Sequence, residues 1–253
     1  MSKFRTILCC ILLVFMALPA FADEMVSLKL GYQSLTPSGT LQGNTGSVGT
    51  KIDVEKNLNF DDNQDVTTEI AFQLGNSRLS LNYLPIEYTG AGSFDGTYNG
   101  QTFTSATDAV TTKVKLNIYD VGYTYNLINL DDLPVRIQLG PELAVKVVDA
   151  QVDFKATGAV SINESDSGTV PIPTLGARAR FGLSDFVAII ARVGYMEYSG
   201  NSFMDAEAQV EFSPLPLVGV YAGYRTFNLT VDEPDLALDV DMSGPFVGAL
   251  VRF

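Results

Sequence analysis

The sequence ends in ALDVDMSGPFVGALVRF (Ala237–Phe253), an alternating segment that runs to the last residue. Successive residues of a strand point to opposite faces, so Arg252 and Gly248 lie on one face and apolar residues on the other. The apolar face consists of Val247, Ala249, Val251 and Phe253. Terminal residues usually fray, but the last strand of a barrel is held because it closes against the first. The segment therefore predicts a closed β-barrel.

This ending resembles the last strand of Gram-negative outer-membrane β-barrel proteins, which is an alternating segment that finishes in Phe. The chain as a whole is similar in pattern to the small barrels of the OmpW and OmpA kind. The resemblance implies that the segment ending at Phe253 is an assembly signal for the barrel-assembly machinery. It also implies an outer-membrane location among lipids and lipopolysaccharide and, for OmpW-like members, the passage of small solutes.

The first 22 residues have the composition of a secretory signal peptide. Lys3 and Arg5 precede the apolar run Ile7–Leu18, and an A-x-A cleavage pattern ends at Ala22. The run is short for a membrane helix, which needs about 20 apolar residues. We therefore predict a signal peptide over residues 1–22 and one barrel domain over residues 23–253.

Composition limits the function. The whole chain carries a net charge of −13 and contains no histidine. Nucleic acid is not an expected partner, because its binding requires a basic surface. The hydrolases and acyltransferases known among such barrels use histidine as a general base, so we expect no enzyme activity. We also expect no cofactor, and both cysteines lie within the signal peptide.

Ten segments of the chain alternate or nearly alternate. Short turns alternate with longer loops between these segments. This is the plan of an all-β, transmembrane, antiparallel up-and-down barrel with an even number of strands. Ten strands are expected, eight if two weak segments do not span, and twelve if Thr50–Phe60 pairs with a neighbour. The segments are Val26–Leu35, Val66–Leu74, Arg78–Tyr88, Thr112–Leu127, Val135–Val147, Val170–Phe181, Phe186–Tyr198, Phe203–Phe212, Val218–Leu229 and Ala237–Phe253.

Two further features concern the outer end of the barrel. Three long polar stretches, Thr36–Asp65, Gly90–Thr111 and Val148–Gly168, are predicted to be outer loops. The apolar phase slips by one near Pro85 and again within Thr112–Leu127. The slip near Pro85 predicts a β-bulge, where a strand proline is tolerated.

Charged residues keep to one face of the proposed strands. A lysine or arginine facing lipid at the bilayer centre costs about 2–4 kcal/mol, so this segregation is expected of a membrane barrel. A soluble sandwich or a lipocalin-like barrel would also alternate, but neither accounts for the aromatic C-terminus. The charged residues expected to line the lumen are Glu69, Lys113, Lys115, Arg136, Glu142, Lys146, Arg178, Arg180, Arg192, Asp205, Glu207, Glu211 and Arg225, together with Lys29, Arg78, Asp120 and Arg252.

Aromatic residues predict where the membrane surfaces lie, because tyrosine and phenylalanine concentrate at both interfaces. The periplasmic girdle is expected to contain Tyr123, Tyr125, Phe181, Phe186, Phe212 and Phe253. The outer girdle is expected to contain Tyr32, Tyr88, Tyr195 and Tyr224.

Two functions fit the charged lumen. The first is a minor porin-like channel for small solutes, in which the acidic strand carrying Asp205, Glu207 and Glu211 faces the basic residues Arg192 and Arg225. The second is a non-conducting structural or surface-interaction barrel, in which the same arginines reach across the lumen and pair with carboxylates. The sequence leaves both hypotheses open.

Overall fold

The computed structural model defines most of the chain after residue 24. The predicted signal peptide, residues 1–22, lies outside the described part. No helix of the described residues is long and apolar enough to cross a membrane. The described residues are 25–43, 51–93, 95–98, 101–106, 109–130, 136–158, 162–215, 217–233 and 236–253.

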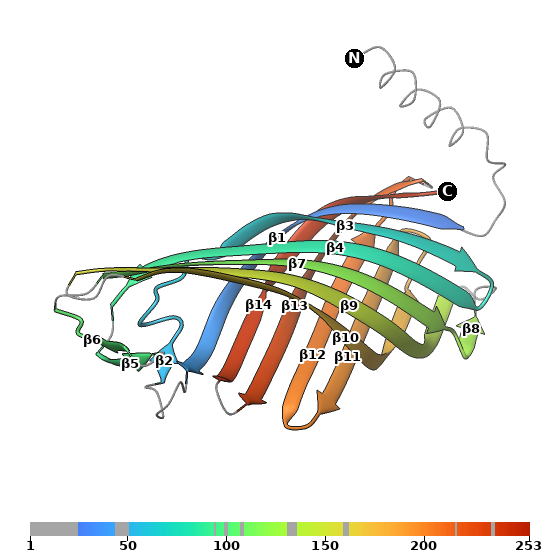
Figure 1. Cartoon of the computed structure of the whole chain (residues 1–253). Coiled ribbons are helices and arrows are strands. Elements are labelled where there is room, and N and C mark those ends of the chain that lie inside the picture. The colour runs from blue at the N-terminus through green and yellow to red at the C-terminus, as the bar shows by residue number, and fades with distance from the viewer. Residues whose placement is uncertain are drawn as a thin grey trace, which may run out of the picture.

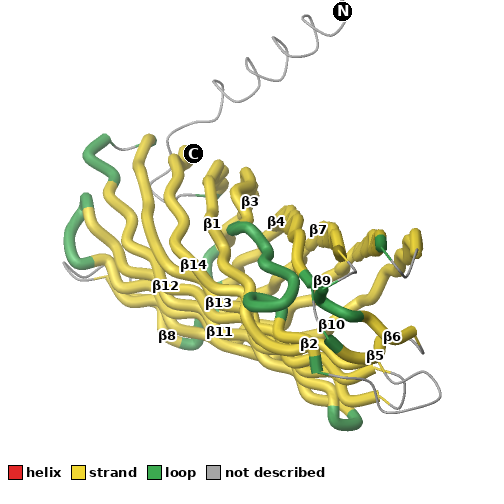
Figure 2. The backbone as a smooth tube through the Cα atoms, turned by 90° about the vertical axis from the view of Figure 1, so that its left-hand side faces the viewer, coloured by secondary structure: helices red, strands yellow, loops and turns green. Residues whose placement is uncertain are grey.

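Ten long antiparallel strands form one closed barrel (Figure 1), which confirms the predicted fold and strand number. Strands make up nearly all of the described backbone (Figure 2). The long strands are β1 (Val26–Gly43), β3 (Asn63–Leu74), β4 (Ser77–Gly92), β7 (Ala109–Tyr125), β9 (Arg136–Thr157), β10 (Ile162–Gly182), β11 (Val187–Tyr198), β12 (Asn201–Phe212), β13 (Val218–Glu233) and β14 (Leu236–Arg252). Short strands are β2 (Ile52–Asp53), β5 (Gly96–Tyr98), β6 (Gln101–Phe103) and β8 (Ile128–Leu130).

The barrel closes where the C-terminal segment predicts. β14 pairs with β1 from Arg252 opposite Ser27 to Leu236 opposite Gly43. The last residue is held as well, because the Phe253 amide donates to the Val26 carbonyl at 2.8 Å and the Val26 amide donates back at 3.1 Å. Closure removes the unpaired edges that an open sheet would expose, over the length in which each strand is paired on both sides.

The two ends of the barrel differ. We call the end that holds both strand termini, Val26 and Arg252, the turn end, and the opposite end the loop end. β4, β7, β9 and β10 reach farthest at the loop end, where β2, β5 and β6 also lie (Figure 1). The outer loop predicted over Val148–Gly168 is wrong, because β9 and β10 stay paired as far as Ala156 opposite Ile162. Polar residues are compatible with a strand there, since the ladder needs only backbone groups.

The apolar residues change faces part-way along the strands. In β4, Leu81 is exposed on the outer surface and Leu84 is buried in the interior, and in β7 Val121 and Ile118 differ in the same way. The pairing of β4 with β7 is nevertheless unbroken over the whole length of β4. The β-bulge predicted near Pro85 is therefore wrong: the backbone keeps its period of two while the polarity of the two faces exchanges.

Pro85 instead ends the pairing on the other edge of β4. The β3–β4 ladder stops at Thr68 opposite Tyr83, just before the proline. Proline has no amide hydrogen to continue a ladder. The Gln33 side chain donates to the Pro85 carbonyl at 3.1 Å, so part of the lost pairing is replaced.

Part of the first predicted loop folds into the barrel at the loop end. β2 pairs with β1 through Ile52 and Leu41, and Ile52, Val54 and Leu58 are buried in one cluster with Val110 of β7 and other residues. We call residues 52–60 the cap segment. Its only strand has two residues, so the twelve-strand alternative is not realised.

The exposed aromatic residues agree with the two expected girdles except at Tyr88 and at Phe253, which is half-buried. Tyr32, Tyr195 and Tyr224 are exposed on the outer surface of the barrel. Tyr88 is buried in the interior instead, because it lies beyond the exchange of faces. The outer surface carries Tyr83 of β4 and Tyr119 of β7 in its place, stacked with ring centroids 5.1 Å apart. Near the turn end, the exposed aromatic residues are Tyr123, Tyr125, Phe181, Phe186 and Phe212.

Candidate functional site

A cluster of five charged side chains occupies the middle of the barrel. It consists of Asp120 (β7), Glu142 and Lys146 (β9), Arg192 (β11) and Asp205 (β12), and we call it the central cluster. The Arg192 guanidinium donates to Glu142 at 2.5 Å and to Asp120 at 2.6 Å. The Lys146 ammonium lies 3.1 Å from Asp120 and 3.3 Å from Asp205. The contacts of Arg192 with Glu142 and Asp120 join strands that are not neighbours in the wall, and so does the contact of Lys146 with Asp205. These three contacts cross the lumen, whereas Lys146 and Asp120 are cross-strand partners on the adjacent strands β9 and β7.

The central cluster excludes water. Lys146 is 1% exposed and Asp120 2% exposed. Buried ions stay charged only when their partners offset the lost hydration, and here each cation contacts two or more carboxylates. The cluster is therefore a filled layer of the interior rather than the lining of a water path.

A second group of charges lies closer to the turn end, and we call it the lower cluster. Glu211 of β12 accepts from Lys29 at 2.9 Å and from Arg180 at 2.7 Å, and it also pairs with Arg252. Arg78 of β4 lies 2.8 Å from Glu69, which the Lys29 ammonium approaches to 3.6 Å. The group is completed by Arg178 of β10. Its members are Lys29, Glu69, Arg78, Arg178, Arg180, Glu211 and Arg252.

Arg225 of β13 forms the remaining interior pair. It binds Glu207 on the neighbouring β12 through two nitrogens. A third nitrogen donates to Gln33 of β1 at 3.1 Å, and the guanidinium lies 5.0 Å from the ring centroid of Phe246. Planar guanidinium groups suit such combined pairing and stacking.

An apolar layer covers the charges on the side of the loop end. Several of its residues take the next inward position after a polar one, as Ile118 follows Asp120, and Phe227 follows Arg225. Burial of this layer removes apolar surface from water and contributes roughly 25 cal/mol per Å². The buried members are Leu35, Leu84, Ile86, Tyr88, Ile118, Ile172, Phe203, Phe227 and Met242.

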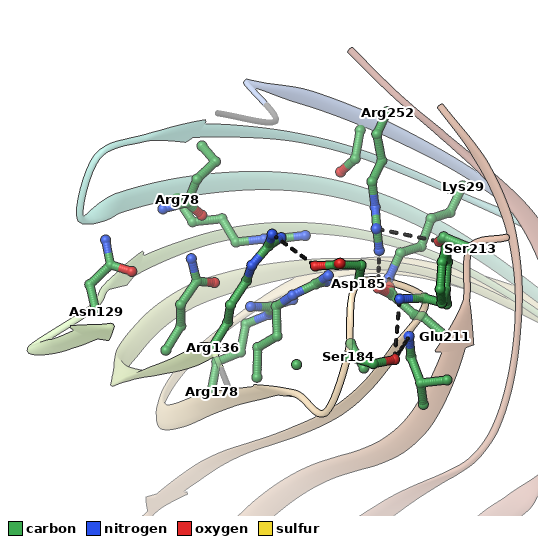
Figure 3. A pocket seen from close by; sticks show the side chains of 18 of the residues that line it. Lys29, Arg78, Asn129, Arg136, Arg178, Ser184, Asp185, Glu211, Ser213 and Arg252 are labelled. Atoms are coloured by element: carbon green, nitrogen blue, oxygen red, sulfur yellow. Dashed lines mark hydrogen bonds and ion pairs between the residues drawn. The ribbon is translucent and has the colours of Figure 1, made fainter. Parts of the chain in front are cut away.

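The turn end holds an open cavity of about 370 Å³. Arginine side chains reach it from different strands (Figure 3), among them Arg78, Arg136 and Arg178. Arg136 makes an exposed pair with Asp185 at 3.4 Å. We call this cavity the vestibule. It is lined mainly by basic and small polar residues, and the lower cluster forms its inner boundary.

Two of the residues expected in the lumen lie elsewhere. Lys113 and Lys115 of β7 project from the outer surface beyond the exchange of faces. Both contact Glu87 of β4, at 2.5 and 3.4 Å. The prediction failed because it took the apolar residues Val114 and Leu116 to face outward, whereas in this part of the strand they pack inward. The other expected lumen residues lie in the clusters described above or, for Arg136, in the vestibule wall.

The hydrogen bond from Lys113 holds the pKa of Glu87 below its usual value of 4.5. A lowered pKa in the folded state means that the Glu87–Lys113 pair contributes stability above the unfolded pKa, and that this contribution is lost as pH falls through the folded pKa.

We expect Lys113→Ala to raise the Glu87 pKa toward 4.5, measured by NMR titration of the carboxyl carbon. Lys155→Ala, on the same outer surface, should leave it unchanged. An unaltered pKa in Lys113→Ala would contradict the assignment.

Sequence analysis missed the uncharged part of the interior. The apolar layer was not anticipated, although the phase slips in β4 and β7 were its signal. Gln33 and Asn126 are also fully buried. The alternation of Val26–Leu35 places Gln33 on the same face as Lys29, whereas nothing in the local sequence marks Asn126. Among the described residues, no group of acidic or thiol side chains could hold a metal ion.

The chain matches no protein-family model and no curated protein. It is similar in structure to the outer-membrane protease OmpT from Escherichia coli, with a TM-score of 0.58, 9% identity, and coverage of 94% of this chain and 99% of that one. Neisserial surface protein A (10% identity, 90% and 97% covered) and the toluene transporter TodX of Pseudomonas putida (10%, 95% and 93%) give TM-scores of 0.38 and 0.32. The similarity to OmpT concerns the fold, which is that of outer-membrane β-barrel proteins.

Proposed function

We propose that this chain, which has the outer-membrane β-barrel fold, lies in the outer membrane of a Gram-negative bacterium as a non-conducting barrel that acts through its surface. The apolar outer belt between the two girdles supports the location. Its expected partners are outer-membrane lipids and lipopolysaccharide around that belt, and the barrel-assembly machinery at the C-terminal strand.

The observation that carries the proposal is the closure of the lumen at three levels. The central cluster fills one level of the lumen, and three of its ion pairs join non-neighbouring strands. The apolar layer fills the next level, and the cap segment packs on the loop side against Val110 and Ala156. A solute channel, the leading expectation from the sequence, would need a path through all three levels.

The surface available for interaction is the wall that continues beyond the outer girdle. There the strands are apolar inside and polar outside, as in a water-soluble barrel. β10 pairs with β11 only from Leu175 to Gly182. The rest of β10, toward the loop end, therefore has one edge that is not paired with β11. Pro171 and Pro173 lie in that stretch, and prolines on an edge strand discourage unwanted pairing. The outward polar side chains include Glu87, Lys113, Lys115, Asn117, Asp149, Gln151, Asp153 and Lys155.

A catalytic role has no support in the interior. The chain contains no histidine, and in the described residues each lumen carboxylate of the central and lower clusters contacts a lysine or arginine. OmpT is a protease, but 9% identity transfers only its fold.

We expect the purified barrel to be silent in a planar lipid bilayer in which a porin control gives discrete conductance steps. The Arg192→Ala/Arg225→Ala double variant should also be silent, because both residues lie below the apolar layer, which remains in place. Regular conductance steps in the parent protein would overturn the proposal. Steps in the double variant alone would mean that the ion pairs close the lumen without help from the apolar layer.

A further inference from the structure

The vestibule at the turn end is a concave site that the closed lumen leaves without a role. Its mouth is surrounded by residues of four connections, among them Gly75, Asn129, Ser184 and Ser213. Its volume of about 370 Å³ falls in the range of ligand pockets, which are usually about 300–1,000 Å³. Figure 3 shows the basic side chains that project into it.

Arg178 lines the vestibule with a buried side chain for which the described part of the fold provides no partner. It is only 7% exposed, yet it forms no hydrogen bond or ion pair with any described residue, and no dashed line reaches it in Figure 3. Its cross-strand neighbours are Gly140 and Arg192, and neither offers a side-chain acceptor. Most buried polar side chains have partners, so a buried guanidinium at a cavity wall indicates a missing acceptor.

The charges around Arg178 do not balance. Among the described residues of the lower cluster, five cations face two carboxylates: Lys29, Arg78, Arg178, Arg180 and Arg252 against Glu69 and Glu211. Both carboxylates are already engaged by other cations. Arg78 and Arg180 lie close enough to Arg178 to repel it, and Glu69 and Glu211 attract it only from beyond ion-pair distance.

An excess of buried positive charge is costly unless an anion compensates it. We propose that the vestibule binds a phosphate group, either inorganic phosphate or the phosphate of a small ester, with Arg178 as the principal ligand. Arginine forks bind phosphate oxygens in pairs. A phosphate carries about −1.5 to −2 charges at neutral pH, which fits the excess better than a single carboxylate. The site does not depend on whether the barrel conducts.

The test is calorimetric titration of the full, folded chain in detergent micelles at low ionic strength, with inorganic phosphate and with glycerol 3-phosphate as probes. We expect saturable binding that weakens as salt is added. Tighter binding of glycerol 3-phosphate would identify an ester as the ligand, and equal binding would identify the phosphate group alone. No saturable binding of either probe would overturn the proposal.

Two variants and a control separate a ligand site from a structural role. Arg178→Gln should weaken phosphate binding roughly tenfold or more, since it removes a charge-assisted hydrogen-bonding group. Its unfolding temperature without phosphate should be unchanged or higher, because it also relieves repulsion; a purely structural arginine would give a lower one. Asp185→Asn should tighten binding, because it removes the carboxylate that competes for Arg136.

Lys113→Gln is the matched control, because it deletes one positive charge on the outer surface and should leave the affinity unchanged. Equal phosphate affinities in the parent, Arg178→Gln and Asp185→Asn proteins would overturn the assignment, whatever the affinity itself is.

Discussion

Replacing Arg192 with alanine is expected to lower the free energy of unfolding by about 3–5 kcal/mol. This is the usual cost of removing one partner of a buried ion pair, because the other charge is left uncompensated. Arg192 contacts three carboxylates. Without it, Asp120 and Asp205 share Lys146, and Glu142 keeps only the hydrogen bond from Thr124 at 2.7 Å. The measurement is equilibrium unfolding in urea of the barrel reconstituted in lipid.

The control for this prediction is Arg136→Ala. Arg136 forms an exposed pair with Asp185 at the vestibule mouth, and such pairs are worth about 0–1 kcal/mol. Adding Glu142→Gln to Arg192→Ala should recover part of the loss, because it removes one uncompensated charge. If Arg192→Ala cost no more than Arg136→Ala, the central cluster would not be a stabilising element.

Replacing Phe227 with alanine is expected to cost a similar amount, about 3–5 kcal/mol, which is typical of truncating a buried phenylalanine. Phe227 is 2% exposed and packs against Phe203, with ring centroids 6.2 Å apart. Its removal would leave a cavity inside the apolar layer. The same urea unfolding experiment measures the effect.

Phe212→Ala is the matched control for this second prediction. Phe212 is 47% exposed on the outer surface at the turn end, so its truncation creates no enclosed cavity and should cost much less. Equal losses for the two variants would contradict the interpretation of the layer as a core. A large loss for Phe227 alone would establish that the loop half of the barrel is stabilised like a soluble protein.

Much of the fold could be predicted because it rests on local pattern. The period of two in segments such as Phe203–Phe212 assigns each strand, and the alternating C-terminal segment predicts closure. The assignment of Lys113 and Lys115 failed for a physical reason. In the part of the barrel that lies between the girdles, the apolar face is outward, whereas beyond the outer girdle it packs inward. The slips of apolar phase in β4 and β7 mark this exchange, but a β-bulge produces the same slip, so the pattern alone does not distinguish the two.

The sequence by itself determined the up-and-down order and the separation of charged from apolar faces, since each depends on residues near one another in the chain. It predicted ten strands with eight and twelve as alternatives, and the tertiary structure decided for ten. Only the tertiary structure decided which charges meet. Arg192 and Asp120 are 72 residues apart, and their contact depends on the register and curvature of the wall between them. It also decided that Arg178 is left without a partner, because the position of an acceptor across the lumen depends on how the whole barrel closes.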